Sequence, residues 1–101
     1  MDDLTLARKI HEREAIALDL LVDRHHSALF RFLGQLTRNQ HDAEDLTQQT
    51  LMRAILGAAK FDGRASLRAW LLGIAFHEFT RHRRRRVWLP ILADITAKGS
   101  E

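Results

Sequence analysis

The sequence predicts an all-α fold, a small helical bundle. Apolar residues recur at spacings of three and four, strand-like alternation is absent, and the only proline is Pro90. With 101 residues, 46% of them hydrophobic, the chain can form one domain around a modest core. We expect residues 1–88 to form this domain and residues 89–101 to be a tail.

Helices are expected at residues 4–10, 13–24, 26–37, 42–58 and 66–86, with a short further helix after Pro90. Thr37–Gln40 interrupts the apolar pattern, so Asp42 is expected to begin a new helix. Asp62-Gly63 indicates a turn, after which Ser66 is a suitable N-cap for the last long helix. The core-facing residues expected of the second and third helices are Leu18, Leu21, Val22, Leu29, Phe32, Leu33 and Leu36.

Composition excludes several classes of protein. Cysteine is absent, so disulfides and thiolate metal sites are excluded, and a reducing compartment is expected. The acidic N-terminus does not resemble a signal peptide, and apolar runs of about seven residues are too short to span a membrane. We therefore expect a soluble cytoplasmic protein without membrane insertion.

Charge is distributed unevenly along the chain. Residues 1–52 carry six Arg or Lys against nine Asp or Glu, whereas residues 53–101 carry ten against four. The asymmetry suggests two faces with different partners, and the basic half suits a polyanion. A well-solvated helical surface is the alternative interpretation.

The expected helix at 42–58 has two contrasting faces. At roughly 100° per residue, one face should contact the core. It comprises Ala43, Leu46, Thr50, Leu51, Ala54 and Ala58. The opposite arc combines a carboxylate and amides with two large apolar residues, which is typical of a protein-binding surface. It comprises Asp45, Gln48, Gln49, Met52 and Leu56. The alternative is that Met52 and Leu56 pack beneath a neighbouring helix.

The last long helix begins apolar and ends strongly basic. Trp70 and Ile74 are expected in the core, whereas residues 81–86 contain five arginines. Arginines at successive positions surround the helix axis and cannot all pair with acids, so phosphate binding is favoured over a solvated helix end.

The loop before this helix is well placed to meet bases while the helix holds the backbone. Arg64, Ser66 and Arg68 could contact base edges or phosphates. Phe61 could stack on an exposed base, or it could equally be a core residue that anchors the loop.

Taken together, these segments resemble a known family. The run Asp42–Gln48, the loop start Lys60–Gly63, then Trp70-Leu71, Ile74-Ala75 and the arginine cluster are similar to region 2 of bacterial sigma-70 factors, and most similar to the extracytoplasmic-function (ECF) group. The resemblance covers about residues 13–88, and its motifs share order and spacing.

The resemblance implies a sigma factor region 2 domain that starts transcription, with no enzyme activity, cofactor or metal. Its expected partners are the β′ clamp helices of core RNA polymerase, the non-template strand of the promoter −10 element, and an anti-sigma factor. The implied polymerase-binding residues are Asp45, Gln48, Gln49, Met52 and Leu56. The implied DNA-binding residues are Lys60, Phe61, Asp62, Gly63, Arg64, Ser66, Arg68, His77, Arg81, Arg83, Arg84, Arg85 and Arg86.

The chain departs from the family pattern at three points. Gln49 stands where many relatives have Glu, and His77 where Asn is common. The length leaves no room for the second domain that reads the −35 element, so we expect a fragment or a truncated protein whose residues 87–101 begin an interdomain linker.

Other functions fit the residues less well. The sequence His77-Glu78-Phe79-Thr80-Arg81-His82 has one residue more than the zinc-protease pattern, and five positions turn the two imidazoles roughly 140° apart. A helix-turn-helix repressor would have a shorter turn than residues 59–65. An interaction module held by an anti-sigma factor is compatible with the main interpretation.

Overall fold

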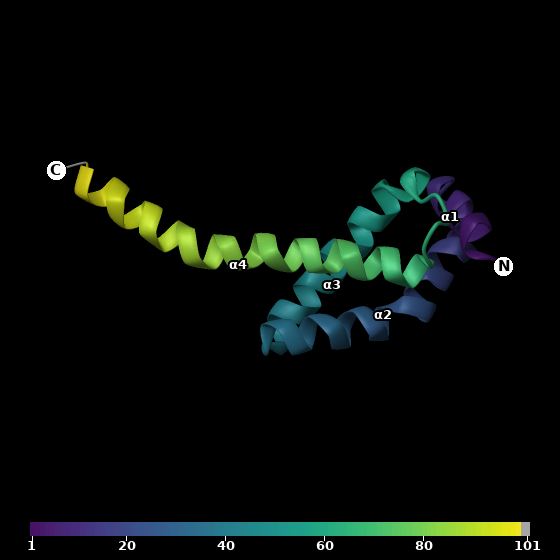
Figure 1. Cartoon of the computed structure of the whole chain (residues 1–101), viewed down its shortest axis with the longest axis horizontal. Helices are drawn as coiled ribbons and strands as arrows, with labels where there is room; N and C mark the ends of the chain where they lie inside the picture. The colour runs from purple at the N-terminus through teal and green to yellow at the C-terminus, as the bar shows by residue number, and fades with distance from the viewer. Residues whose placement is uncertain (100–101) are drawn as a thin grey trace.

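The computed structural model describes residues 1–99, and within them the backbone is mainly helical and contains no strand. Its elements are α1 (Asp3–His11), α2 (Ala15–Thr37), α3 (Gln40–Leu56), the 3-10 turn η1 (Ala58–Lys60) and α4 (Leu67–Gly99). Helices α2, α3 and α4 pack against one another, and α1 lies across the end where α3 leads into α4 (Figure 1). The all-α prediction is confirmed.

Side chains and left-handed residues define the helix ends. Asp2 caps α1 by accepting a hydrogen bond from the Thr5 N–H at 2.8 Å. Arg13, between α1 and α2, and Arg38, which caps the end of α2, have left-handed backbones with φ values of 62° and 53°. Asn39 caps α3, so this helix begins at Gln40 rather than at Asp42. Asp42 instead lies in the first helical turn, which frees its carboxylate for a contact with α4.

The predicted core face of α3 is confirmed. Its five residues within the helix, from Ala43 to Ala54, are all less than a tenth exposed. The sixth, Ala58, is also buried but lies in η1, because α3 ends at Leu56 rather than at the predicted residue 58. The buried hydroxyls of Thr47 and Thr50 donate to the carbonyls of Ala43 and Leu46, each at 2.7 Å. These bonds satisfy polar groups that burial would otherwise penalise.

The predicted division at residue 25 is wrong, because α2 is one continuous helix. Leu21, His25, Leu29 and Leu33 are all buried at intervals of four residues, so one stripe runs unbroken through the histidine pair. Val22 is 43% exposed, so the expectation that it lies in the core is wrong.

The predicted end of the last helix at residue 86 is also wrong, since α4 continues through Pro90 to Gly99. A proline removes one backbone hydrogen bond, here to the Arg86 carbonyl, and it can bend a helix without ending it. Figure 1 shows α4 extending well beyond the bundle and bending towards its far end. The expected domain boundary after residue 88 falls inside this helix and stays a prediction.

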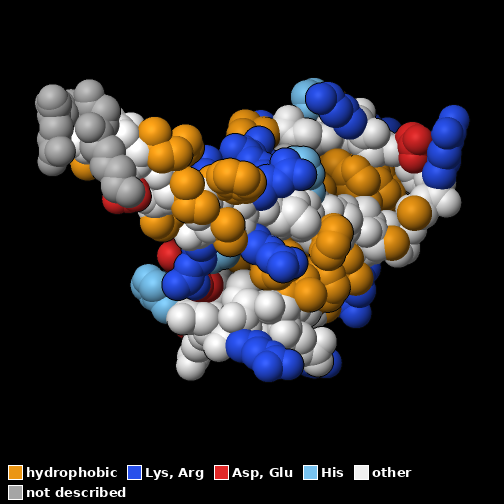
Figure 2. All heavy atoms as spheres, turned by 60° about the vertical axis from the view of Figure 1, so that its left-hand side comes forward, with side chains coloured by type: hydrophobic (Ala, Val, Ile, Leu, Met, Phe, Trp, Pro, Cys, Tyr) orange, Lys and Arg blue, Asp and Glu red, His pale blue; other side chains and the backbone are white. Residues whose placement is uncertain are grey.

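The protruding part of α4 carries uncovered apolar side chains. Val87, Trp88, Leu89, Ile91, Leu92 and Ile95 are each between 45% and 59% exposed. On the face shown in Figure 2, Lys and Arg side chains lie between apolar groups of the protruding helix and apolar groups of the bundle. The apolar and basic surfaces are therefore neighbours on this face.

Candidate functional site

The outer face of α3 forms a continuous exposed stripe. Met52 is 63% exposed and Leu56 is 72% exposed, although the opposite face of the same helix is buried. Asp45, Gln48 and Gln49 are exposed on the same arc. Since no neighbouring helix covers Met52 and Leu56 within the described residues, the packing alternative is excluded. We call these five residues the α3 stripe.

A groove of about 410 Å³ separates the α3 stripe from α4. Its residues include Gln49, Met52 and Leu56 on one side and His82 and Arg85 on the other. At the bottom of the groove, Arg53 Nε lies 2.6 Å from Oε1 of Glu78, whose side chain is only 4% exposed. Arg81 adds a weaker contact at 3.7 Å to the same oxygen. This ion pair compensates a buried carboxylate and joins the middle of α3 to α4.

Arg53 and Glu78 were missed by the reasoning from sequence. The two residues are 25 positions apart, and each alone is typical of a charge on a solvated helix face. Only the packing of α3 on α4 brings them together.

Residues 61–66 form a loop that is anchored at one end and exposed at its tip. Phe61 is 7% exposed, and its ring meets Trp70 edge-on with centroids 5.5 Å apart. This corresponds to the anchoring alternative, so the ring is not available to stack on a base in this conformation. Whether Phe61 contacts DNA stays a prediction.

The tip of the loop is a tight turn. Asp62 Oδ1 accepts the Arg64 N–H at 3.0 Å, and Gly63 has a φ of +78°. Arg64 Nε lies 3.3 Å from Asp62, and the Arg64 side chain is 90% exposed. The Ser66 hydroxyl accepts the Ala69 N–H at 3.0 Å, which confirms the predicted cap of α4.

Arg68 is exposed, but its guanidinium contacts α2. Its Nη2 donates to the Arg24 carbonyl at 2.6 Å, and its Nε lies 3.4 Å from Nδ1 of the buried His25. Burial lowers the pKa of His25, and the Arg68 charge lowers it further. A neutral imidazole leaves Nδ1 able to accept from the guanidinium, so these two side chains join α4 to α2.

Lys60 and His77 lie beside a second hollow, of about 500 Å³, between the end of α3 and α4. Trp70, Gly73 and Ile74 supply its mainly apolar α4 wall. Trp70 and Ile74 are half-buried there instead of fully enclosed, although their packing against the core agrees with the prediction.

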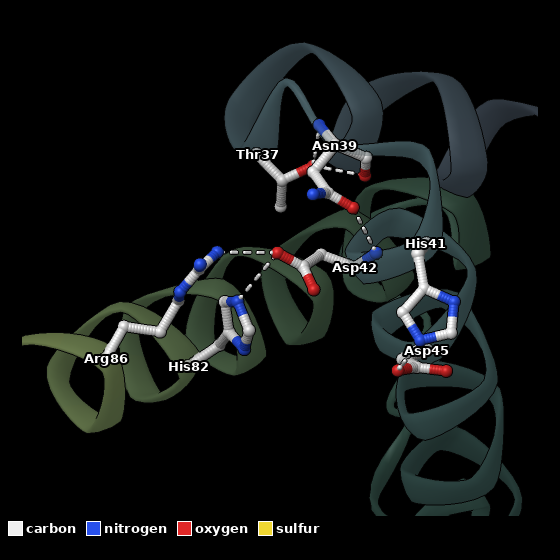
Figure 3. Close-up of polar contacts among 7 residues, drawn as sticks. All are labelled: Thr37, Asn39, His41, Asp42, Asp45, His82 and Arg86. Atoms are coloured by element: carbon white, nitrogen blue, oxygen red, sulfur yellow. Dashed lines mark hydrogen bonds and ion pairs between the residues drawn. The ribbon is translucent and has the colours of Figure 1, made fainter. Parts of the chain in front are cut away.

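Within residues 1–99, the arginine cluster divides into a first group with acidic partners, Arg81 and Arg86, and a second group without them, Arg83, Arg84 and Arg85. Arg86 Nη1 lies 2.8 Å from Asp42 Oδ2, and His82 Nε2 lies 3.4 Å from the same oxygen. Figure 3 shows Arg86 and His82 reaching from α4 towards Asp42 at the start of α3, with His41 and Asp45 turned away from them. Arg83, Arg84 and Arg85 are exposed and make no ion pair among the described residues. The second group is free to bind an external anion.

Two further classes of feature are absent from the described residues. No three His, Cys, Asp or Glu side chains in residues 1–99 are grouped closely enough to hold a metal ion. None of the described helices is both long and apolar enough to cross a membrane.

Comparison with known proteins agrees with this architecture. Residues 21–89 match the family model for sigma-70 region 2. The ECF RNA polymerase sigma factor SigX of Bacillus subtilis is 38% identical over 58 residues, which are 57% of this chain and 30% of that protein. The RNA polymerase sigma factor YlaC of the same organism is 34% identical over 71 residues, covering 70% of this chain and 41% of its own length.

A third relative comes from another genus. The probable RNA polymerase sigma-C factor of Mycobacterium bovis is 38% identical over 66 residues, 65% of this chain and 35% of that protein. The chain thus spans about a third of the length of these relatives. Because the family match covers most of α2 and all of α3, the loop and the bundled part of α4, the chain belongs to the sigma-70 region 2 family.

Proposed function

We propose that this chain is the part of an ECF-type sigma factor that binds core RNA polymerase and opens the promoter −10 element. The α3 stripe binds the clamp helices of the β′ subunit. The loop at residues 61–66 and the adjoining face of α4 capture the non-template strand, and the basic part of α4 holds its phosphates.

The α3 stripe is the observation that carries the proposal. Exposing Met52 and Leu56 at 63% and 72% beside Asp45 and Gln48 costs solvation free energy unless a partner covers them. The arrangement combines apolar contact area with hydrogen-bonding groups, as protein interfaces do. A helical partner such as the clamp helices fits an exposed helix face that has a groove along one side.

The exposed chemistry of the loop and of α4 supports the DNA half of the proposal. With Phe61 buried, Asp62 and Arg64 are the loop side chains available to base edges, and Lys60 and His77 border the neighbouring apolar hollow. Arg83, Arg84 and Arg85 then supply sequence-independent affinity through phosphates.

A pull-down of the β′ clamp-helix segment tests the polymerase half. The double variant Asp45→Lys/Gln48→Ala and the double variant Met52→Ala/Leu56→Ala should each reduce capture by at least about tenfold, since a hot-spot residue at the centre of an interface costs more than about 1 kcal/mol when it is truncated. Asp19→Lys is the matched control, because Asp19 is an exposed carboxylate on α2 rather than on the helix that carries the stripe. Circular dichroism should show unchanged helix content for all three variants.

Equal capture of the stripe variants and the wild-type chain would refute the polymerase assignment.

A comparison of single-stranded with duplex promoter DNA tests the DNA half of the proposal independently. Tighter binding to the non-template single strand is expected, whereas a preference for duplex DNA would instead identify a repressor-like regulator.

A further inference from the structure

Helix α1 lies outside residues 21–89, the part of the chain that matches the family model, yet it contacts the loop that precedes α4. Asp3 Oδ2 accepts the backbone N–H of Leu67, the first residue of α4, at 2.9 Å. The Leu67 N–H is one of the amides that a helix start cannot satisfy by itself. A carboxylate from a helix 64 positions away therefore fixes the point where the loop becomes α4.

The tip of the loop also rests on α1. A Cβ atom placed on Gly63 would lie 2.9 Å from Leu4 Cγ, so the Leu4 side chain is seated directly against the turn. Gly63 also has a φ of +78°, a conformation that few other residues adopt without strain. The turn is thus held from outside by Leu4 as well as from within by Asp62.

The segment before the loop is fixed to the same N-terminal region. Leu6 and Ile10 are 0% and 2% exposed, and α1 packs on η1. Just beyond α1, Arg13 Nη1 donates to the Ile55 carbonyl at 3.2 Å, near the end of α3. Contacts from residues 3–13 therefore flank the connection from α3 to α4 at its start, its middle and its end, as the proximity of α1 to this connection in Figure 1 also shows.

We propose that α1 is a positioning element for base recognition, with Asp3 and Leu4 as positioning residues that set the selectivity of the loop. A loop discriminates between bases only if its donors and acceptors stay within about 0.5 Å of their working positions. Exposed loops are mobile unless other elements hold them. The inference rests on the proposed function, because it assumes that the loop at residues 61–66 reads bases.

The test uses the whole chain and a pool of single-stranded DNA oligonucleotides with randomised central positions. Asp3→Ala removes the acceptor of the Leu67 N–H, whereas Asp3→Asn removes the charge and keeps an acceptor oxygen. Glu12→Ala is the control, because it removes one exposed carboxylate at the end of α1 without touching the loop. Base enrichment is measured by sequencing the bound fraction, and amide hydrogen exchange reports on Leu67.

For Asp3→Ala we expect Leu67 exchange to rise about fivefold, the typical effect of losing a helix cap. The base preference at the loop-read position, about tenfold for one good base contact, should fall towards none. Affinity for the unselected pool should stay unchanged, because the phosphate-binding arginines are untouched. Asp3→Asn should restore most of the preference, and Glu12→Ala should behave as the wild-type chain does.

Wild-type enrichment in Asp3→Ala would overturn the inference. If Asp3→Ala unfolds, Leu4→Ala is the deciding variant. Leu4 is 53% exposed, so its truncation should leave the fold intact while lowering base selectivity. Unchanged selectivity in Leu4→Ala would again overturn the inference. A wild-type chain that enriches no base would contradict the proposed function itself, so the two failures are distinguishable.

Discussion

The division of the arginine cluster predicts which residues bind DNA phosphates. Arg83, Arg84 and Arg85 are exposed and without ion pairs among the described residues, whereas Arg86 is held 2.8 Å from Asp42. Replacing the first three with Ala should weaken DNA binding strongly. Replacing Arg86 alone should change it much less, because a guanidinium engaged by Asp42 must give up that partner before it can bind a phosphate.

The magnitude follows from counterion release. Each phosphate neutralised on a single strand contributes about 0.7 to the slope of log affinity against log salt. If each of the three arginines meets one phosphate, the triple variant should have a slope shallower by about 2. Between about 50 and 200 mM salt, the wild-type affinity should therefore fall roughly 20-fold more than the variant affinity.

Fluorescence anisotropy with a labelled single-stranded oligonucleotide, titrated at several salt concentrations, measures this slope directly. Arg86→Ala is also compared with Arg85→Ala, since each removes one arginine at neighbouring positions of α4, and Arg85→Ala should have the larger effect. The Arg86–Asp42 pair is partly exposed, so its loss should cost no more than about 1 kcal/mol of stability. A triple variant with the wild-type slope, or a single Arg86 variant with the larger effect, would refute the division.

Two further predictions concern the fold around the loop. Phe61→Ala should lower the free energy of unfolding by about 3–5 kcal/mol, because it empties a buried site beside Trp70; a loss below about 1 kcal/mol in urea denaturation would contradict the anchoring role. Because the pKa of His25 is lowered in the folded chain, the unfolded chain binds more protons than the folded chain once the pH falls towards and below the ordinary value of 6.5. Its contribution to stability should be complete above that pH and be lost on acidification towards the lowered pKa, and His25→Gln should remove this part of the pH dependence in urea denaturation curves. An unchanged pH profile in His25→Gln would exclude His25 as the source.

The two faces of α3, including the α3 stripe, could be predicted from the sequence because helix periodicity is a local property. At about 100° per residue, the order of residues in α3 separates Ala43 and Leu46 from Asp45 and Met52, whatever the helix packs against. The exposure of Met52 and Leu56 still required the structure, since periodicity places two residues on one face without saying whether another helix covers that face.

The errors have local and non-local causes. The helix expected to end at residue 86 continues through Pro90. Bending can relieve the steric clash of a proline ring with the preceding turn, and here the helix is free to bend because it protrudes from the bundle. Asp42 was expected to begin α3, but Asn39 takes the cap and leaves the Asp42 carboxylate to meet Arg86, which is 44 positions away.

The sequence by itself determined the fold class, the two faces of α3 and the presence of a basic segment, all of which depend on composition and on spacings within one helix. The tertiary structure alone decided that Phe61 is buried, which arginines are already paired, and that α1 holds the loop through Asp3 and Leu4. The physical reason is the same in each case. These properties depend on which distant segments meet, and the free energy of such contacts comes from burial and ion pairing that no single segment contains.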